Sequence, residues 1–234
     1  MDPVLSLTPS QRLHQVRERI AAAARRAGRD PADITLLAAS KGHAASELSA
    51  LFDLGQRQFG ESYVQEARDK QSELASLPLE WHFIGHVQSN KAKYVVGNFQ
   101  LIHTVDSVKL AQALHAQAER RQVRQAVLLQ VNIGEEASKS GAAADELERL
   151  ALEVRGLSGL EVCGLMCLPP FFSDPELARP YFVRLRELRD LLAPRLGQVL
   201  PQLSMGMSLD LEVAVEEGAT IVRVGTDLLG PRRV

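Results

Sequence analysis

The first hydrophobic residues of the chain are spaced by three and four positions, with polar residues between them. They are Leu13, Val16, Ile20 and Ala23. This spacing places their side chains on one face of a helix. Thr8 and Gln11 form the signature of a capping box, and Pro9 suits the first helical position. The pattern predicts a helix that begins after Thr8 and ends near Gly28, a residue that suits a helix C-terminus.

Short apolar runs then alternate with longer amphipathic stretches. The runs predict strands over residues 34–39, 57–59, 81–84, 101–104, 127–131, 160–166, 202–205 and 220–224. The stretches between them predict helices over residues 46–55, 64–74, 90–96, 108–122, 143–155, 176–192 and 209–217. Strands that alternate with helices need crossover connections, and they therefore predict a parallel sheet.

Eight strand–helix units in about 200 residues match the count and size of a closed (β/α)8 barrel. We therefore predict an α/β fold, a single (β/α)8 TIM barrel with an extra N-terminal helix, in which residues 1–234 form one domain. The run at residues 57–59 is weak, and six units are enough for an open doubly wound sheet. Such an open sheet is the alternative.

Composition and charge exclude several classes of protein. Of the 234 residues, 45% are hydrophobic and 24% are charged, as in an average globular protein. The 27 basic and 29 acidic residues give a net charge of −2, so we expect neither nucleic acid nor a membrane as a partner. With two cysteines, no signal-peptide pattern and no apolar run of about 18–20 residues, the sequence predicts a cytoplasmic protein.

Polar residues follow the predicted strands at the end where a parallel barrel places its functional site. They include Lys41, Ser62, His86, Ser208, Gly225 and Thr226. Residues 169–175 are rich in proline and phenylalanine, and they form a candidate functional loop after the sixth strand. Two nucleotide fingerprints, the P-loop and the G-x-G-x-x-G turn, are missing from the sequence.

The loops after the seventh and eighth strands are candidates for phosphate binding. Barrels of this kind often bind phosphate there, because helix N-termini offer free N–H groups. Ser208 and Thr226 add hydroxyl groups, and Gly206 and Gly225 let the backbone approach an anion closely. The alternative is that Ser208 and Thr226 only cap their helices. The sequence leaves both interpretations open.

Two cationic residues at the predicted barrel mouth suggest specific chemistry. Burial lowers the pKa of a lysine, and the neutral amine of Lys41 then forms a Schiff base with an aldehyde such as pyridoxal 5′-phosphate (PLP) or a sugar phosphate. The alternative is an exposed lysine at a strand end. Arg223 interrupts an apolar strand, so it needs a partner. That partner is a carboxylate, Asp210 or Glu212, or else the ring nitrogen of a cofactor.

Histidine and cysteine pairs raise the question of a metal site. His82 and His86, like Cys163 and Cys167, are four residues apart, whereas zinc sites more often contain closer cysteine pairs. We therefore expect no metal, with core packing for His82 and both cysteines, and a ligand contact for His86. Glu61 is read either as an acid–base group of the rim or as a solvated side chain.

Several stretches resemble the pyridoxal phosphate homeostasis proteins, which share the barrel of the N-terminal domain of alanine racemase (a fold-type III PLP barrel). The resemblance covers nearly the whole chain. It is carried by residues 36–41, 59–66, 81–91, 136–141, 203–208 and 222–226. Residues 82–91 and 203–208 are the most specific of these stretches. This sequence departs from the family pattern at two positions, with Gly42 in place of threonine and Ser62 in place of asparagine.

The resemblance implies a set of cofactor contacts. Lys41 carries PLP as a Schiff base, and Arg223 faces the pyridine nitrogen. Ser208, Gly225 and Thr226 hold the phosphate. Ser62, His86 and Met205 complete the expected cofactor-binding residues, and the two departures bear on the ring contacts.

The resemblance also implies a role in intracellular PLP (vitamin B6) homeostasis and amino-acid balance without robust catalysis. PLP-dependent apo-enzymes are the expected acceptors, and we expect a monomer. One alternative is an amino-acid racemase with weak activity. Efficient racemisation needs a second acid–base group, which alanine racemase takes from a C-terminal domain, and this chain ends eight residues after Thr226. Another alternative is a sugar-phosphate aldolase or isomerase that uses Lys41 without PLP.

Overall fold

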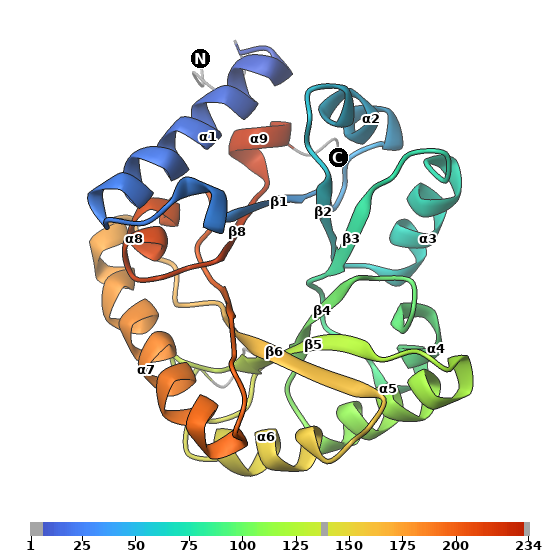
Figure 1. Cartoon of the computed structure of the whole chain (residues 1–234). Coiled ribbons are helices and arrows are strands. Elements are labelled where there is room, and N and C mark those ends of the chain that lie inside the picture. Colours follow the sequence, from blue (N-terminus) through green and yellow to red (C-terminus); the bar gives the residue numbers. More distant parts are fainter. Residues whose placement is uncertain (1–6, 137–139, 232–234) are drawn as a thin grey trace.

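The computed structural model describes residues 7–136 and 140–231. Within them, eight parallel strands close into a barrel in the order β1 to β8, and helices surround the strands (Figure 1). The barrel closes where Thr35 of β1 pairs with Ile221 of β8. The predicted closed barrel is therefore confirmed over the open sheet. The family-like stretch 136–141 lies partly outside the described residues.

The strands follow the predicted apolar runs closely. They are β1 (Thr35–Ala39), β2 (Gln58–Glu61), β3 (Glu80–Phe83), β4 (Leu101–Val105), β5 (Gln125–Val131), β6 (Leu160–Cys167), β7 (Gln202–Ser204) and β8 (Ile221–Val224). The weak run near residue 58 does form a strand, because Gln58 to Glu61 pair in register with Glu80 to Phe83.

The helices match the prediction less well at their ends. They are α1 (Pro9–Arg26), α2 (Ala45–Asp53), α3 (Val64–Glu73), α4 (Ala92–Val95), α5 (Val108–Arg121), α6 (Leu147–Arg155), α7 (Arg179–Leu196), α8 (Leu211–Glu216) and α9 (Thr226–Leu229). Short 3₁₀ turns at Ser89–Lys91 and Pro175–Ala178 precede α4 and α7. The predicted starts of α6 and α7 were therefore four and three residues too early, since a turn precedes each regular helix.

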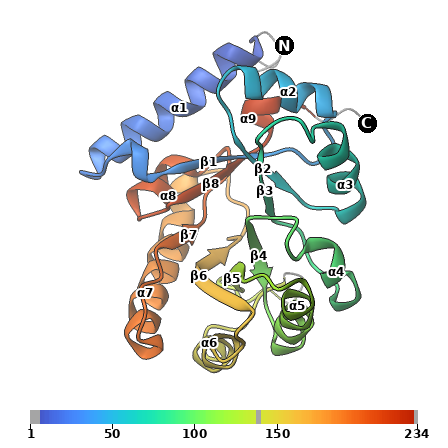
Figure 2. The same ribbon diagram turned by 45° about the vertical axis from the view of Figure 1, so that its right-hand side comes forward.

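The first helix forms as predicted and lies outside the barrel. Thr8 caps α1 in a capping box with Gln11. The helix packs against α8 and α9, so the start of the described chain lies beside its end (Figure 2). Arg12 strengthens this contact, because its guanidinium donates hydrogen bonds to the carbonyl oxygens of Leu228 and Leu229.

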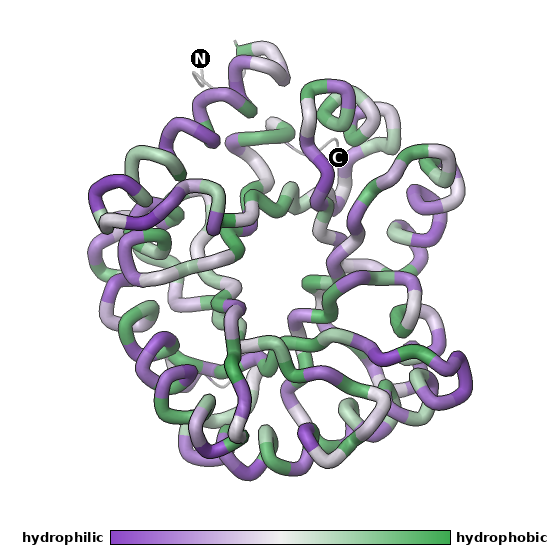
Figure 3. The backbone as a smooth tube through the Cα atoms, viewed as in Figure 1, coloured by the Kyte–Doolittle hydropathy of each residue, from purple (hydrophilic) through white to green (hydrophobic). Residues whose placement is uncertain are grey.

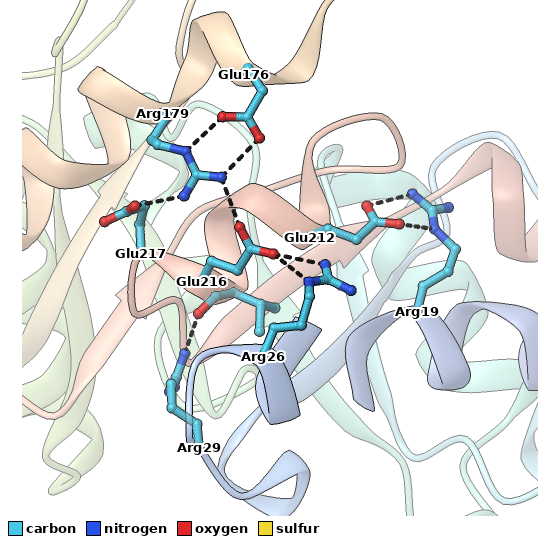
Figure 4. A network of polar contacts seen from close by, with 9 residues as sticks. Arg19, Arg26, Arg29, Glu176, Arg179, Glu212, Glu216 and Glu217 are labelled. Carbon is cyan, nitrogen blue, oxygen red and sulfur yellow. Dashed lines mark hydrogen bonds and ion pairs between the residues drawn. The ribbon is translucent and has the colours of Figure 1, made fainter. Parts of the chain in front are cut away.

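A network of arginine and glutamate side chains also joins α1 to the last third of the chain (Figure 4). Arg26 of α1 and Arg179 at the start of α7 both contact Glu216 of α8, each at 2.7 Å. Arg19 of α1 pairs with Glu212 at 2.6 Å. These groups are partly exposed, so each pair contributes little to stability by itself.

The core consists of two layers separated by the barrel wall. Most buried apolar side chains fill the space between the strands and the helices. The helices alternate between hydrophobic and hydrophilic positions along their length, as this arrangement requires (Figure 3). A smaller cluster fills part of the barrel interior and contains Leu37, Leu101, Leu128, Met166 and Ile221.

Within the described residues, every helix is too short or too polar to cross a bilayer.

Candidate functional site

A cavity of about 420 Å³ opens at the C-terminal ends of the strands. Six of the eight residues expected to bind a cofactor line it, namely Lys41, Ser62, Ser208, Arg223, Gly225 and Thr226. Apolar side chains that include Ile84, Met166 and Leu168 line it as well. The predicted functional loop also contributes, because Pro170, Phe171 and Phe172 form part of the wall. A rim with mixed polar and apolar character therefore encloses a space large enough for a small molecule.

Lys41 lies two residues after the end of β1, at the first position of a turn, and is half-buried. Its ammonium nitrogen lies 4.5 Å from the ring centre of Tyr63, in a cation–π contact. The next residue, Gly42, has φ +77°, in the left-handed region that favours glycine. Glycine, found here where the family pattern has threonine, therefore suits the backbone of this turn.

A buried ion cluster supports the two neighbours of Lys41. Lys70 of α3 donates hydrogen bonds to the carbonyl oxygen of Ser40 at 2.7 Å and to Glu61 at 2.6 Å. It also contacts Glu66 at 2.7 Å, and Glu66 accepts the backbone N–H of Gly42 at 2.6 Å. The cluster therefore fixes the backbone on both sides of the lysine.

Glu61 is part of this cluster, and neither interpretation made from the sequence was right. It is fully buried, and one of its oxygens accepts hydrogen bonds from Lys70 and from the Ser40 hydroxyl. Burial raises the pKa of Glu61, while the hydrogen bond from Lys70 opposes that shift. Glu61 is therefore a structural group beneath the loop, and neither a rim acid nor a solvated side chain.

Arg223 is buried in the wall of the cavity, and its hydrogen-bond partners are not the predicted carboxylates, although the charge of Asp210 attracts it. Its guanidinium donates to the Ser204 hydroxyl at 2.5 Å and to the carbonyl oxygen of Cys167 at 2.9 Å. Asp210 instead accepts the backbone N–H of Met207 at 2.6 Å. Glu212 is on the outer face, where it pairs with Arg19 of α1. Strand β8 points Arg223 into the barrel, away from the side on which Glu212 lies.

Beyond Ser204, two buried histidines continue the line of polar contacts. The Ser204 hydroxyl lies 2.9 Å from Nδ1 of His103, and Nε2 of His103 lies 3.0 Å from Nδ1 of His82. Burial lowers the pKa of His82 to about 4, and it also lowers the pKa of His103. Both rings are therefore neutral at pH 7. Core packing was the correct prediction for His82.

The loops after β7 and β8 lie at the same cavity, but only one of them starts a helix where predicted. Gly225 directly precedes α9, as expected. Ser208 does not begin α8, which starts at Leu211 after a turn. Of the two interpretations left open for Ser208, helix capping is therefore wrong. Its backbone oxygen instead accepts a hydrogen bond from Arg19 at 2.6 Å.

Two expected cofactor residues lie elsewhere. His86 is exposed and lines a neighbouring cavity, with Nδ1 3.9 Å from a carboxylate oxygen of Asp106. Met205 is fully buried in the outer core layer. Ser62 lines both cavities, and Gly85 packs so closely on it that a Cβ atom there would collide with the Ser62 backbone oxygen.

Sequence reasoning missed Lys70, Glu66, His103 and Ser204, all of which support Lys41 or Arg223. One signal was available for the last two. His103 lies two residues after the inward-facing Leu101 of β4, and Ser204 follows the outward-facing Leu203 of β7, so strand alternation turns both polar side chains to the barrel interior. Lys70 gave no comparable signal, because a lysine on an amphipathic helix usually lies on the solvated face.

Comparisons with known proteins agree with this architecture. The family model for the alanine racemase N-terminal domain matches residues 12–233. A pyridoxal phosphate homeostasis protein of Pseudomonas aeruginosa is 48% identical over 225 residues, covering 96% of this chain and 96% of that protein. Another of that name, from Aquifex aeolicus, is 45% identical over 223 residues, covering 95% and 98%.

A solved structure gives the same result. PipY of Synechococcus elongatus, determined with PLP bound, has 37% sequence identity and a TM-score of 0.81. The similarity covers 92% of this chain and 100% of that chain. With the closed barrel, the cavity at its mouth and relatives that match almost end to end, the chain belongs to the pyridoxal phosphate homeostasis protein family.

Proposed function

We propose that the protein holds PLP in the cavity as a Schiff base on Lys41 and serves in PLP homeostasis without robust catalysis. The observation that carries this proposal is that a half-buried lysine and a buried arginine line one cavity. In forming the Schiff base, the amine of Lys41 condenses with the aldehyde, a C=N bond replaces the C=O bond, and water leaves.

The chemistry of the lining fits each part of PLP. Arg223 is a cationic donor suited to the lone pair of a pyridine nitrogen. The hydroxyls of Ser208 and Thr226 and the backbone at Gly225 suit a phosphate group. Ile84, Met166 and Leu168 provide apolar surface for the ring. The bound structure of the relative PipY adds independent support.

The proposal of weak catalysis rests on electrostatics. PLP stabilises carbanions by acting as an electron sink, and a protonated ring nitrogen strengthens that role. A guanidinium beside the nitrogen disfavours its protonation. Arg223 would therefore leave the ring a weaker sink, which suits binding and delivery more than turnover.

An absorbance titration with PLP tests the binding site. We expect a visible band in the wild-type protein and in Lys91→Ala, a matched control at the neighbouring cavity, but no such band in Lys41→Ala. Borohydride reduction followed by mass spectrometry of peptides should place the added mass on Lys41. A wild-type protein without a visible band in excess PLP would overturn the proposal and favour the sugar-phosphate alternative.

Two further measurements test the role in homeostasis. We expect the loaded protein to restore activity to a PLP-dependent apo-enzyme faster than an equal amount of free PLP does. Exchange of the α-hydrogen of L-alanine with deuterium should stay at the rate of free PLP. Delivery no faster than free PLP would contradict a carrier role, and rapid exchange would favour the racemase alternative.

A further inference from the structure

A line of four polar side chains crosses the barrel interior and ends at the cavity. His82, His103, Ser204 and Arg223 belong to β3, β4, β7 and β8. The contacts along the line measure 3.0, 2.9 and 2.5 Å. His82 and His103 come from the neighbouring strands β3 and β4, and Ser204 and Arg223 come from the neighbouring strands β7 and β8. The contact between His103 and Ser204 joins these two pairs across the barrel interior.

All four residues are almost completely buried. His103 and Ser204 are fully inaccessible, while Arg223 and His82 are 4% and 7% exposed. Polar groups in such a place must find their hydrogen-bond partners within the protein, because little water reaches them. The chemistry of the four groups therefore restricts which atom carries each proton.

The direction of the line follows from its arginine end. A guanidinium has only donors, so the Ser204 oxygen accepts from Arg223. In the part of the chain described, Ser204 Oγ contacts two polar side chains, Arg223 and His103. Since Arg223 cannot accept, the hydroxyl proton points at Nδ1 of His103.

The position of this hydroxyl proton also decides where the two histidines carry theirs. A neutral His103 that accepts at Nδ1 carries its proton on Nε2, which then donates to Nδ1 of His82. His82 in turn carries its proton on Nε2. One arrangement of protons thus satisfies every contact, and each link points from Arg223 toward His82.

We propose that Ser204, His103 and His82 are positioning residues that hold Arg223 as a fixed donor at the cavity. The site would then recognise a heteroaromatic ring whose nitrogen carries a free lone pair, and disfavour a ring that is already protonated. This inference deepens the proposed function and rests on it for the identity of the ligand. The proton arrangement itself is independent of any ligand.

Nitrogen-15 NMR of the histidine side chains tests the arrangement in the ligand-free, full-length protein. Signals are assigned by comparison with His82→Asn and His103→Asn. We expect both rings to be neutral with the proton on Nε2 from about pH 6 to about pH 8. A proton on Nδ1 of His103, or a charged ring at neutral pH, would overturn the proposal.

A matched pair of variants then tests the positioning role. Asparagine and leucine have similar shapes, but the side-chain oxygen of asparagine can take the place of Nδ1 and accept from Ser204. We expect His103→Leu to raise the Kd for PLP about tenfold and to shift the visible band, and His103→Asn to raise it less than about threefold. Thermal unfolding without PLP controls for a general loss of stability.

The outcomes separate the two proposals. If the wild-type protein binds no PLP while the NMR signals match, the proposed function fails and the proton arrangement stands. Equal losses of PLP affinity in His103→Leu and His103→Asn, with equal losses of stability, would assign the histidine a purely structural role and overturn the inference.

Discussion

Two buried polar clusters support the site in different ways. Beneath Lys41, a lysine and two glutamates form ion pairs as short as 2.6 Å. Beneath Arg223, a hydroxyl and two neutral histidines carry hydrogen bonds across the barrel. The first cluster lies between the barrel wall and α3, where Glu66 is partly exposed. The second lies in the interior of the barrel, where His103 and Ser204 are fully inaccessible.

The difference shows how depth selects the chemistry of a polar cluster. Burying a charged group costs more free energy than burying a neutral polar group, so buried charges need close partners of opposite charge. Lys70 has such partners in Glu61 and Glu66. In the barrel interior Arg223 donates hydrogen bonds to a backbone oxygen and a hydroxyl, and its opposite charge is the nearby carboxylate of Asp210. Histidines that are neutral extend this arrangement without adding a second charge.

Removing the lysine from the ion cluster should have the largest effect. Lys70→Met leaves the fully buried Glu61 without its cation, and breaking a buried pair in this way costs about 3–5 kcal/mol. The free energy of unfolding, measured in urea, reports the loss. Lys93→Met, at an exposed lysine of α4, is the control and should change stability by less than about 0.5 kcal/mol.

A double variant sharpens this test. In Lys70→Met/Glu61→Met both members of the closest pair become apolar, so part of the lost stability should return. If Lys70→Met costs no more than Lys93→Met, the short contacts of Lys70 contribute nothing to stability, and the contrast with the interior cluster disappears.

The interior cluster should instead make the stability of the protein depend on pH. The pKa of His82 is about 4 in the folded state, against 6.5 for an ordinary histidine. As the pH falls from about 6.5 to about 4, the unfolded chain binds a proton that folded His82 refuses, so stability falls, by roughly 3 kcal/mol in total. His103 acts in the same direction. Above about pH 7 this contribution is constant.

In the ion cluster, the contribution of Glu61 to stability should change with pH in the opposite direction. Because burial raises the pKa of Glu61, its folded form takes up a proton at a higher pH than its unfolded form. Its contribution to stability therefore grows as the pH falls. The free energy of unfolding in urea is measured for the wild type and for His82→Asn at each pH. The difference between the two values cancels the contribution of the carboxylates that both proteins share. A flat difference between about pH 4 and about pH 6.5 would refute the histidine prediction.

The surface network should give the smallest effect. Glu216→Gln removes two ion pairs of 2.7 Å, one with Arg26 and one with Arg179, in the network drawn in Figure 4. Both arginines are partly exposed, so the loss should be below about 1 kcal/mol in dilute buffer. At about 1 M salt, where charges are screened within about 3 Å, the difference should nearly vanish. A larger loss that persists in salt would place this network with the buried clusters.

The barrel could be predicted because each strand carries its own apolar run. Even the weak run at Phe59 was found, since the alternation of strands and helices leaves a place for it. Helix ends were harder to predict, because side-chain caps and 3₁₀ turns are decided by contacts that a hydrophobic pattern does not record. The turn at residues 208–210 is one example, since Asp210 bonds the backbone of Met207 and delays the start of α8.

The cavity residues were predictable for a related reason. Lys41, Ser208 and Thr226 each follow a strand, and a parallel barrel brings such positions together. Ser204 and His103 are 101 positions apart and meet only through closure of the barrel, so no local pattern indicates their contact. For the same reason the sequence left a carboxylate or a cofactor nitrogen as the partner of Arg223 and did not indicate its hydrogen bonds to a hydroxyl and a backbone oxygen.

The pairing of Thr35 with Ile221 also has a consequence for synthesis of the protein on the ribosome. At about 5–20 residues per second, roughly 10–40 s pass between the emergence of β1 and that of β8. During this delay the apolar face of α1 and one edge of β1 remain uncovered on the nascent chain. A chaperone that shields the first forty residues would therefore protect the newborn protein at its most aggregation-prone stage.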